Sequence, residues 1–456
     1  MPYPYIKYAF TPVITGYTTL DSLVASKYLV GASLPATLGT IVTADNGDTY
    51  ILGQAHDDLY QNTPTLTVNT STFITSYGGG YYISPPMFLN KDERGWFRKI
   101  NETFVKSPLS TTVYNVKSAP YNATGDGSTD DTTAVQAAIT ACGTSGGTVY
   151  FPAGTYMVNT TGANPLVLLD NMNVKIDPTA TVKLITNNDD THQCFVALNK
   201  TNITIYGGGT IQGERATHIG STGEWGMGIE LDGCTNCVIE NLTVKDCWGD
   251  GVYIGKNASV QCKNIKVYQV YSTNNRRQGM SIVAVDDNVH VDRCIFANII
   301  GTNPESGIDV EPNSGDTVTN VKITNCLLID TQGAGLEIFG LGGAVTGVVA
   351  INNVCVRNFF HGIWAKKSIN GIFRGNYCVN NRDTAISIEQ DSSGNLVDNN
   401  VCYNSNLGIT IGLGGADTTT NTTVSNNKAF KNPSVDIWNR GTSTTETNNE
   451  YFSHLP

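Results

Sequence analysis

The stretch Gly307-Ile308-Asp309-Val310 is one copy of a four-residue unit, Gly-apolar-x-apolar, that recurs along the C-terminal two-thirds of the chain. The unit returns as Gly279-Met280-Ser281-Ile282 and as Gly335-Leu336-Glu337-Ile338, each 28 residues away. Further copies, 23 to 28 residues apart, start at Gly228, Gly251, Gly362, Ala385 and Gly408. A repeat this short cannot bury its apolar face alone, so successive repeats must stack around a shared core.

A second apolar run precedes each unit, and polar turns separate the two. One example, Val321-Lys322-Ile323-Thr324, lies between the units that start at Gly307 and Gly335. Each repeat therefore predicts two or three short strands joined by turns. A leucine-rich horseshoe needs a Leu-x-x-Leu-x-Leu pattern that this sequence lacks, and a propeller needs periods above about 40 residues. We therefore predict an all-β fold, a parallel β-helix or solenoid.

The region before the repeats predicts one helix. Asp130 and Asp131 are good N-cap residues, and Ala134, Val135, Ala138 and Ile139 share one apolar face. We expect a helix over about residues 131–142 that covers the open strand edges of the first coil. The first strand is then expected in the run Gly147-Thr148-Val149-Tyr150-Phe151.

Two segments around this helix resemble a known superfamily. Residues 121–132 read Tyr-Asn-Ala-Thr-Gly-Asp-Gly-Ser-Thr-Asp-Asp-Thr, and residues 149–156 read Val-Tyr-Phe-Pro-Ala-Gly-Thr-Tyr. They resemble the N-terminal signature of the pectate-lyase-like β-helix superfamily, which is common in phage tailspikes and in secreted polysaccharide-degrading enzymes. The resemblance covers residues 115–440 and implies a right-handed parallel β-helix. It does not identify a substrate.

The composition divides the chain into three parts. Residues 1–115 are rich in Tyr and Thr and lack the repeat, so we expect a small β-rich N-terminal segment, or else irregular extra coils of the solenoid. Residues 116–440 form the predicted β-helix with its capping helix, and residues 441–456 form a short tail. If the chain is a tailspike, residues 1–115 would attach it to tail or baseplate proteins of the virion.

Charge and cysteine content exclude several classes of protein. The formal net charge of −11 argues against a nucleic-acid partner, since phosphate binding needs clustered Lys and Arg. We find no signal peptide and no run of about 18 apolar residues, so we expect no membrane insertion. Eleven cysteines, an odd number, point to free buried thiols rather than a disulfide framework.

Three acids are expected to meet on one outer patch. Side chains of a strand alternate, so the residue between inward-pointing Ile308 and Val310 points outward. Coils lie about 4.8 Å apart, so these outward residues form a column. The column reads Glu230, Tyr253, Ser281, Asp309, Glu337, Trp364, Ser387 and Thr410, and the positions two residues on add Glu311, Phe339 and Lys366. We take Asp309, Glu337 and Glu311 as candidate catalytic residues.

Cations and aromatic side chains surround this patch. Outward acids are ordinary on a solvated face, so their neighbours strengthen the hypothesis. The candidate substrate-binding residues are Arg276, Arg277, Trp248, Asp250, Tyr253, Trp364, His361 and Lys366. The two arginines are alternatively salt-bridge partners of the acids, and His361 is alternatively a turn residue. His192, with Asp189 and Asp190, fits a loop, and we expect no metal site.

The function that these features predict is cleavage of a polysaccharide. Glycosidic hydrolysis needs one protonated and one ionised carboxyl group, and close like charges separate two pKa values in this way. The resemblance implies a homotrimeric phage tailspike that endo-hydrolyses a bacterial surface polysaccharide, without a cofactor. One alternative is a polysaccharide lyase in which the acids hold Ca²⁺ and Arg276 or Arg277 aids proton abstraction. The other is a tail fibre that binds glycan without cleaving it. The combined motifs of polygalacturonase-like hydrolases are absent, whereas residues 307–313 resemble a segment of tailspike β-helices.

Overall fold

A computed structural model describes residues 112–452 continuously, together with six short strands of the preceding part. The chain divides into two compact units, Met1–Phe104 and Val105–Pro456. In the first unit, an antiparallel sheet runs in the order β1-β2-β6-β5-β4-β3. Its strands are β1 (Ile41–Thr43), β2 (Thr49–Gly53), β3 (Ile74–Ser76), β4 (Tyr81–Ile83), β5 (Met87–Leu89) and β6 (Trp96–Lys99). Most of residues 1–111 lie outside the described part, so their adaptor role remains a prediction.

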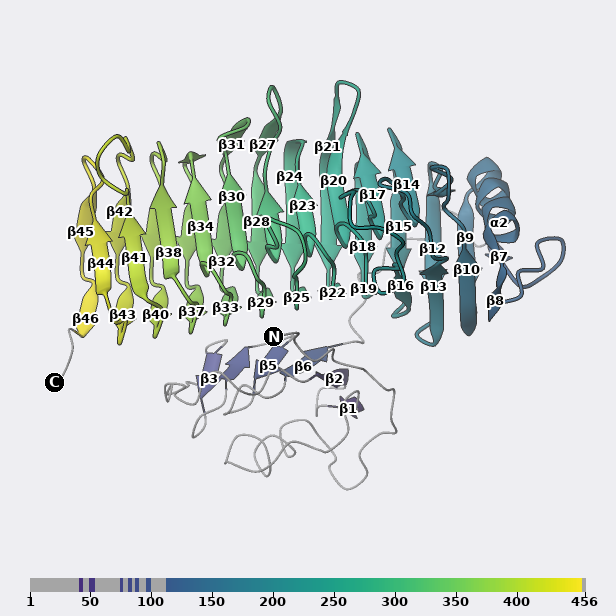
Figure 1. Ribbon diagram of the computed structural model, residues 1–456, viewed down its shortest axis with the longest axis horizontal. Coiled ribbons are helices and arrows are strands. Elements are labelled where there is room, and N and C mark those ends of the chain that lie inside the picture. The colour runs from purple at the N-terminus through teal and green to yellow at the C-terminus, as the bar shows by residue number, and fades with distance from the viewer. Residues whose placement is uncertain are drawn as a thin grey trace. The chain divides into compact units, whose positions relative to one another are not determined.

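The second unit is a parallel β-helix with three faces (Figure 1). Face 1 contains β7 (Val113–Asn115), β9 (Gly147–Phe151), β12 (Met172–Ile176), β15 (Ile203–Tyr206), β18 (Thr235–Glu240), β21 (Val260–Tyr268), β24 (Val285–Asp292), β28 (Val321–Thr324), β32 (Val349–Ile351), β36 (Ile372–Arg374), β39 (Leu396–Asp398), β42 (Thr423–Ser425) and β45 (Thr445–Thr447). Face 2, a 13-stranded sheet, contains β8 (Asp126–Asp130), β10 (Gly154–Val158), β13 (Ala180–Leu184), β16 (Thr210–Gln212), β19 (Thr243–Lys245), β22 (Tyr271–Thr273), β25 (Ile295–Ala297), β29 (Leu327–Ile329), β33 (Val354–Val356), β37 (Tyr377–Val379), β40 (Val401–Tyr403), β43 (Lys428–Phe430) and β46 (Glu450–Phe452).

Face 3 is formed by the Gly-apolar-x-apolar units. It contains β11 (Leu166–Val167), β14 (Phe195–Leu198), β17 (Ile229–Asp232), β20 (Val252–Asn257), β23 (Met280–Ile282), β26 (Ile308–Val310), β30 (Leu336–Phe339), β34 (Ile363–Lys366), β38 (Thr384–Glu389), β41 (Leu407–Ile411) and β44 (Val435–Asn439). The short strands β27 (Thr317–Thr319), β31 (Ala344–Thr346) and β35 (Ser368–Ile369) extend some of the turns. The predicted β-helix is thus confirmed.

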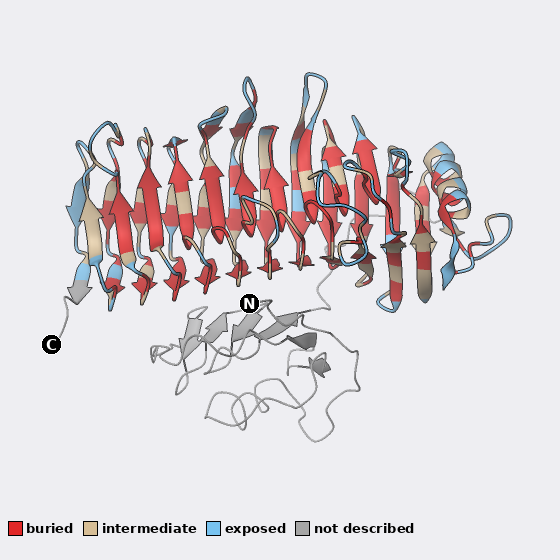
Figure 2. Ribbon diagram, in the orientation of Figure 1, coloured by how far each residue is buried: buried red, intermediate tan, exposed pale blue. Residues whose placement is uncertain are grey.

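The core runs through the middle of the coils. Ile308 and Val310 are fully buried, as are Leu336 and Ile338 one coil further on. Figure 2 shows that such buried positions continue along the strands of all three faces. Each apolar residue stacks on its counterpart in the next coil, for instance Ile308 on Leu336. The core therefore grows by one layer with each repeat.

One helix, α2 (Thr132–Ser145), covers the first coil, as predicted, and ends three residues later than expected. Val135, Ala138 and Ile139 are fully buried. Asp131 occupies the N-cap position but makes no side-chain capping bond. Its carboxylate instead accepts hydrogen bonds from the backbone N–H groups of residues 124 and 125.

Stacked asparagines hold the turns together. The side chains of Asn353, Asn376, Asn400 and Asn427 each donate to a backbone carbonyl of the preceding coil. Many turn residues, mostly Asn, have positive φ, a conformation that Asn adopts more readily than most residues. All eleven cysteines are buried, and none of them forms a disulfide.

The last coils extend further than expected. β45 pairs with β42, and β46 pairs with β43, so the stack reaches Phe452. The sequence lacks a Gly-apolar-x-apolar unit there, which is why residues 441–456 were expected to be a tail. In the described part of the chain, no helix is long and apolar enough to cross a membrane.

Candidate functional site

The predicted outward column exists on face 3. Ser281 pairs with Asp309, Asp309 with Glu337, and Glu337 with Trp364 in register. The same register runs from Glu230 through Tyr253 at one end to Thr410 at the other. Period-two alternation within short strands therefore placed Asp309 and Glu337 correctly relative to one another.

The expectation that Asp309 and Glu337 face solvent is wrong. Asp309 is 1% exposed and Glu337 is 5% exposed. Side chains of neighbouring coils pack against each other along the column, and turn residues close in from one side. Gln278 donates to Asp309 Oδ2 at 2.8 Å, and Ser306 Oγ donates to Glu337 Oε2 at 2.7 Å.

These two bonds belong to one continuous buried network. The Ser306 N–H donates to Gln278 Oε1 at 2.8 Å, so Gln278 and Ser306 connect the two acids. Asp309 Oδ1 is buried without a hydrogen-bond partner. Neither Gln278 nor Ser306 is among the site residues predicted from the sequence, because each lies in the turn immediately before a repeated unit rather than within it.

Burial gives both acids unusual protonation behaviour. Burial, followed by the charges of Glu337 and Glu311, raises the pKa of Asp309 well above its ordinary value. Burial also raises the pKa of Glu337, while the Ser306 hydroxyl and the Lys366 charge oppose that rise. The pair therefore combines Asp309, whose pKa is raised strongly, with Glu337, whose anion has stabilising partners in Ser306 and Lys366.

An aromatic groove opens beside Glu337. A hollow of about 420 Å³ is lined by Asn303, Pro304, Glu305, Gln332, Gly333, Ala334, Glu337, Phe359, Phe360 and Trp364. Phe359 is 41% exposed, with the Arg382 guanidinium 3.9 Å above its ring. Flat aromatic area of this kind suits sugar rings. A larger hollow, about 580 Å³, lies along α2 and is lined by Thr, Gln, Ala, Asn and Pro; it contains none of these acids.

Lys366 and Glu389 complete the end of the patch near the groove. Lys366 Nζ lies 3.3 Å from the centre of the Trp364 ring and 4.7 Å from that of Phe339. Glu389 is buried, pairs with Lys366 across the strands, and accepts a 3.0 Å hydrogen bond from Ser387. Glu389 stands two residues after Ser387, the offset that identified Glu311, so applying that offset to every unit would have found it.

The other end of the patch is a network of charges around Arg277. Arg277 lies 3.3 Å from Asp250 and 3.2 Å from Glu224. Asp250 is fully buried and also accepts from Ser281 at 2.7 Å. Arg277 is therefore a salt-bridge residue, but its partners are Asp250 and Glu224 rather than the three candidate catalytic acids. Asp250 is engaged by Arg277 and Ser281 and is thus part of this network. Glu311 and Tyr253 are both partly exposed and border the patch.

A second pair of acids, Glu230 and Asp232, lies further along the column. Burial and the neighbouring Glu230 raise the pKa of Asp232 to about 8, and burial raises that of Glu230. Asp232 is not among the site residues predicted from the sequence, although it stands two residues after the column residue Glu230.

Arg276 and Trp248 do not join the acid patch, contrary to the prediction. The Arg276 guanidinium lies 3.9 Å from the Trp248 ring centre and donates to the carbonyls of residues 221 and 223. Trp248 also stacks on His218, with 3.9 Å between ring centres, and is 8% exposed. Little of the indole remains for a sugar, so both residues hold a loop instead.

His361 is a turn histidine, the alternative given above. Its Nδ1 accepts the backbone N–H of Thr384 at 3.2 Å, and its ring packs against Phe360 and Trp364. Burial lowers its pKa to about 3. It is therefore neutral near pH 7 and supports the groove without contributing charge.

Comparison with known proteins agrees with this architecture. A family model described as "Right handed beta helix region" matches residues 199–368. The uncharacterized protein YclG of Bacillus subtilis is 31% identical over 227 residues, which are 43% of this chain and 38% of YclG. Exopolygalacturonase rpg13 of Rhizopus delemar is 25% identical over 274 residues, 57% of this chain and 72% of the relative. The chain spans only 25% to 38% of the length of YclG and two further curated relatives.

Solved structures show the same fold. The Streptococcus pneumoniae surface adhesin PfbA has a TM-score of 0.57 at 20% identity, covering 75% of this chain and 90% of that one. The mannuronan C-5 epimerase AlgE6 A-module of Azotobacter vinelandii scores 0.55 at 19% identity, covering 75% and 96%. The Dettilon tailspike protein scores 0.50 at 17% identity, covering 72% and 68%. The chain therefore contains a right-handed parallel β-helix, as the resemblance implied.

Proposed function

We propose that face 3 binds a polysaccharide in the groove beside Glu337 and hydrolyses it with Asp309 and Glu337. The observation that carries this proposal is the buried pair itself, joined through Gln278 and Ser306, with Glu337 lining an aromatic hollow. Asp309, protonated by its surroundings, acts as general acid toward the leaving oxygen. Glu337, whose anion Ser306 and Lys366 stabilise, acts on the anomeric carbon.

The spacing favours one stereochemical course. Paired residues on neighbouring coils lie about 4.8 Å apart, and retaining glycosidases hold their carboxyl groups about 5–5.5 Å apart. The Asp309–Glu337 pair therefore suits retention with Glu337 as nucleophile. Glu311, which follows the end of β26 two residues after Asp309, is the alternative partner, and a larger separation of the two carboxyl groups would suit inversion.

Hydrolysis fits these residues better than the lyase alternative. A lyase needs a base, for which Arg276 and Arg277 were the candidates. Arg277 is held by Asp250 and Glu224, and although burial opposes it, the charge of Asp250 raises the pKa of Arg277. Arg276 is stacked on Trp248 and bonded to the carbonyls of residues 221 and 223. Calcium needs several ionised carboxylates, whereas burial raises the pKa of Asp309 well above its ordinary value. An unsaturated product that absorbs in the ultraviolet, together with loss of activity in chelator, would favour the lyase.

The biological setting we propose is a phage tailspike acting on a bacterial surface polysaccharide. Residues 1–115 would attach it to the virion tail, and three chains would assemble. An exopolygalacturonase among the relatives and a tailspike of the same fold are in keeping with this setting. The adhesin of the same fold represents the remaining alternative, glycan binding without cleavage.

The test is incubation of the full chain with a panel of bacterial surface polysaccharides, followed by sizing of the products. Asp309→Asn and Glu337→Gln should each lower the cleavage rate roughly 10²–10⁴-fold, the usual contribution of one acid–base group. Folding should persist, because the amide replaces an acid whose pKa burial has raised. Binding to the same polysaccharide should also persist.

The matched control is Glu450→Gln, an exposed acid on face 2 that pairs with Lys428. It should cleave like the parent. Parent-like cleavage by both site variants would exclude these acids as catalysts, and Glu311→Gln then becomes the variant to examine. Binding without any shortening of the polysaccharide by the parent would replace hydrolysis with the adhesin-like alternative.

A further inference from the structure

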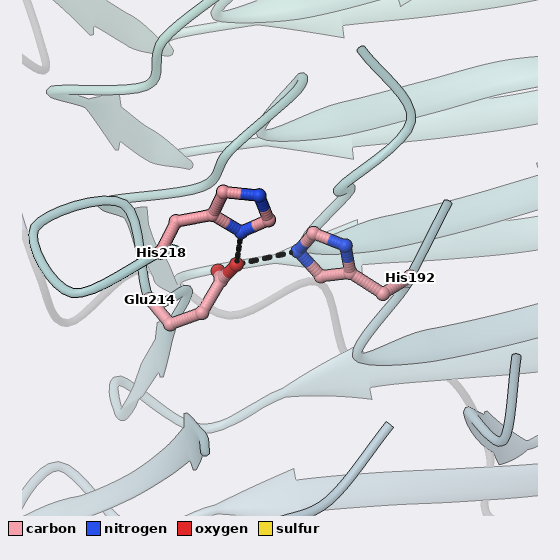
Figure 3. A group of neighbouring side chains, drawn as sticks. All are labelled: His192, Glu214 and His218. Carbon is pink, nitrogen blue, oxygen red and sulfur yellow. Dashed lines mark hydrogen bonds and ion pairs between the residues drawn. The ribbon is translucent and has the colours of Figure 1, made fainter. Parts of the chain in front are cut away.

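A cluster of two histidines and a glutamate lies outside the acid patch. His192 precedes β14, while Glu214 and His218 lie on the loop that follows β16 (Figure 3). Their nitrogen and carboxylate atoms all lie within 4.8 Å of one another. The loop brings Glu214 and His218 together by a helical turn, in which the His218 N–H donates to the Glu214 carbonyl at 2.8 Å.

Both histidines direct a nitrogen at the same carboxylate oxygen. His192 Nε2 and His218 Nδ1 each lie 2.7 Å from Glu214 Oε1. The His218 contact has hydrogen-bond geometry, whereas His192 Nε2 and the second oxygen, Oε2, have no hydrogen-bond partner. His192 is 0% exposed and Glu214 is 3% exposed, so water does not satisfy these atoms.

The surroundings of His192 show which ring nitrogen carries a hydrogen. Its Nδ1 lies 2.7 Å from the Asp189 carbonyl, which only accepts, so Nδ1 carries the hydrogen. In neutral His192, Nε2 is then a bare lone pair that faces a carboxylate oxygen. The contact requires either a second proton on Nε2 or a cation that both atoms bind once they have moved apart. A backbone carbonyl that fixes one ring nitrogen in this way is the usual second contact of a metal-bound histidine.

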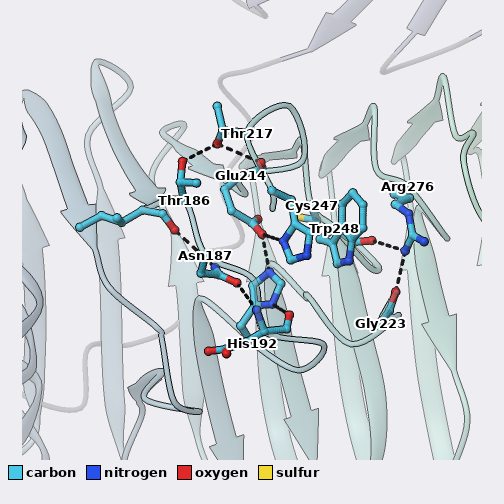
Figure 4. A network of polar contacts seen from close by, with 12 residues as sticks. Thr186, Asn187, His192, Glu214, Thr217, Gly223, Cys247, Trp248 and Arg276 are labelled. Carbon is cyan, nitrogen blue, oxygen red and sulfur yellow. Dashed lines mark hydrogen bonds and ion pairs between the residues drawn. The ribbon is translucent and has the colours of Figure 1, made fainter. Parts of the chain in front are cut away.

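The surrounding side chains hold the cluster rigidly (Figure 4). Trp248 stacks on His218, and Arg276 stacks on Trp248. Thr217 receives a 2.7 Å hydrogen bond from Thr186 and donates to the Glu214 carbonyl at 3.1 Å. Preorganised ligands of this kind reduce the entropy lost when an ion binds.

Space next to His192 is kept open by a glycine. A Cβ atom at Gly226 would lie 2.7 Å from His192 Nε2 and 2.7 Å from Trp248 Cβ. Any larger residue would therefore fill the space beside the unpartnered nitrogen.

We propose that His192, Glu214 and His218 bind a divalent transition-metal ion of the zinc class. Two imidazole nitrogens and one carboxylate are a donor set that suits Zn²⁺, whereas Ca²⁺ and Mg²⁺ take oxygen ligands. The ion would separate the crowded donors and satisfy both orphaned atoms. This site is independent of the proposed hydrolysis.

The metal would fasten the loop between β16 and β17 to the coil that carries His192. That loop also carries Glu224, which pairs with Arg277 beside Asp250. The ion would thus position the loop that borders the acid patch, although its own ligands lie apart from the proposed catalytic acids.

The experiment uses the full chain, stripped with chelator and titrated with Zn²⁺ alone in a calorimeter. We expect one Zn²⁺ per chain and a melting temperature that rises with Zn²⁺ concentration, as linkage requires. His192→Ala and Glu214→Gln should each weaken binding more than about 10–100-fold, the loss typical of removing only an outer partner. Substitution by Co²⁺ should give the visible absorption of a low-coordinate site in the parent alone.

The matched control is His290→Ala. His290 is another half-buried histidine, bonded to Tyr268 and Thr324 on face 1, and its loss should leave Zn²⁺ binding unchanged. Gly226→Ala, which keeps all three ligands, should also weaken binding by filling the open space. Absence of a Zn²⁺ site in the parent, or equal binding by the parent and Glu214→Gln, would overturn the proposal.

Discussion

Each of the stacked asparagines forms hydrogen bonds with backbone groups in the turns, which the strands leave unpaired. Asn400 donates to the Phe373 carbonyl at 2.8 Å and accepts from the Asn376 N–H at 2.8 Å. It also donates to Asn427 Oδ1 at 2.9 Å, which passes the same arrangement to the next coil. The residue is fully buried, so no water can replace these bonds.

Asn400→Ala should therefore destabilise the β-helix by about 2–3 kcal/mol, since it leaves buried donors and acceptors unpaired. Chemical denaturation followed by circular dichroism measures the change in unfolding free energy. Asn313→Ala, at an exposed turn position, should change it by less than about 0.5 kcal/mol. Equal effects of the two substitutions would show that the stacked asparagines contribute little to the stability of the β-helix.

The Glu230–Asp232 pair makes stability depend on pH. Burial and Glu230 raise the pKa of Asp232 from 3.8 to about 8. Between these values the folded chain holds a proton that the unfolded chain has released. Its stabilising contribution is thus complete below pH 3.8 and is lost as pH rises through about 8.

Asp232→Asn should remove this loss of stability at higher pH. At pH 8 the variant should be more stable than the parent by on the order of 1 kcal/mol or more, and near pH 4 the difference should shrink. Melting temperatures measured across that range report the effect. A variant less stable than the parent at pH 8 would mean that Asp232 is ionised and needed as an anion.

The spacing of residues along the sequence predicted where the site residues lie, but it did not predict their burial or their contacts. The alternation around Ile308 and Val310 fixed the register of Asp309 and Glu337, because it depends only on strand geometry. Their burial depends on Gln278 and Ser306, which reach them from turns one coil away. The cluster of His192, Glu214 and His218 depends on the path of a loop, and sequence periodicity carries no information about that path.

At the scale of elements, α2 is joined to the first coil by a carboxylate. Asp131 accepts from the Thr124 N–H at 2.6 Å and the Gly125 N–H at 2.9 Å, and it is 2% exposed. The apolar face predicted the helix, because Val135 and Ile139 must be covered. The role of Asp131 was not predictable, since it contacts residues before the helix rather than the helix itself.

Asp131→Ala should loosen this junction, because two backbone N–H groups, of which that of Gly125 is buried, lose a charged acceptor worth about 1.5–3 kcal/mol each. Hydrogen exchange should accelerate at Thr124 and Gly125 and in α2, while the coils beyond β16 stay protected. Asp126→Ala removes an acid that bonds the exposed residues Ser128 and Thr129, and serves as the control. Acceleration spread evenly over all coils would contradict a local role for Asp131.

For the whole molecule, we propose a homotrimer with β-helices side by side. Face 1 carries an apolar stripe at outward positions of three successive coils. Val349 pairs with Ile372 and Ile372 pairs with Leu396, and each is partly exposed. Apolar side chains at outward positions of a solenoid gain free energy when a neighbouring surface covers them.

Light scattering at micromolar concentration should therefore give three times the chain mass of 48.9 kDa. Ile372→Asp should lower the mass toward that of one chain, since it places a charge in the centre of the stripe. The neighbouring Phe373 faces inward, so the core should keep its packing. Its circular dichroism should match that of the parent. Thr181→Asp, at an outward position of β13 on face 2, should remain trimeric. A monomeric parent would exclude the trimer, and a trimeric Ile372→Asp would move the interface to another face or to residues 1–115.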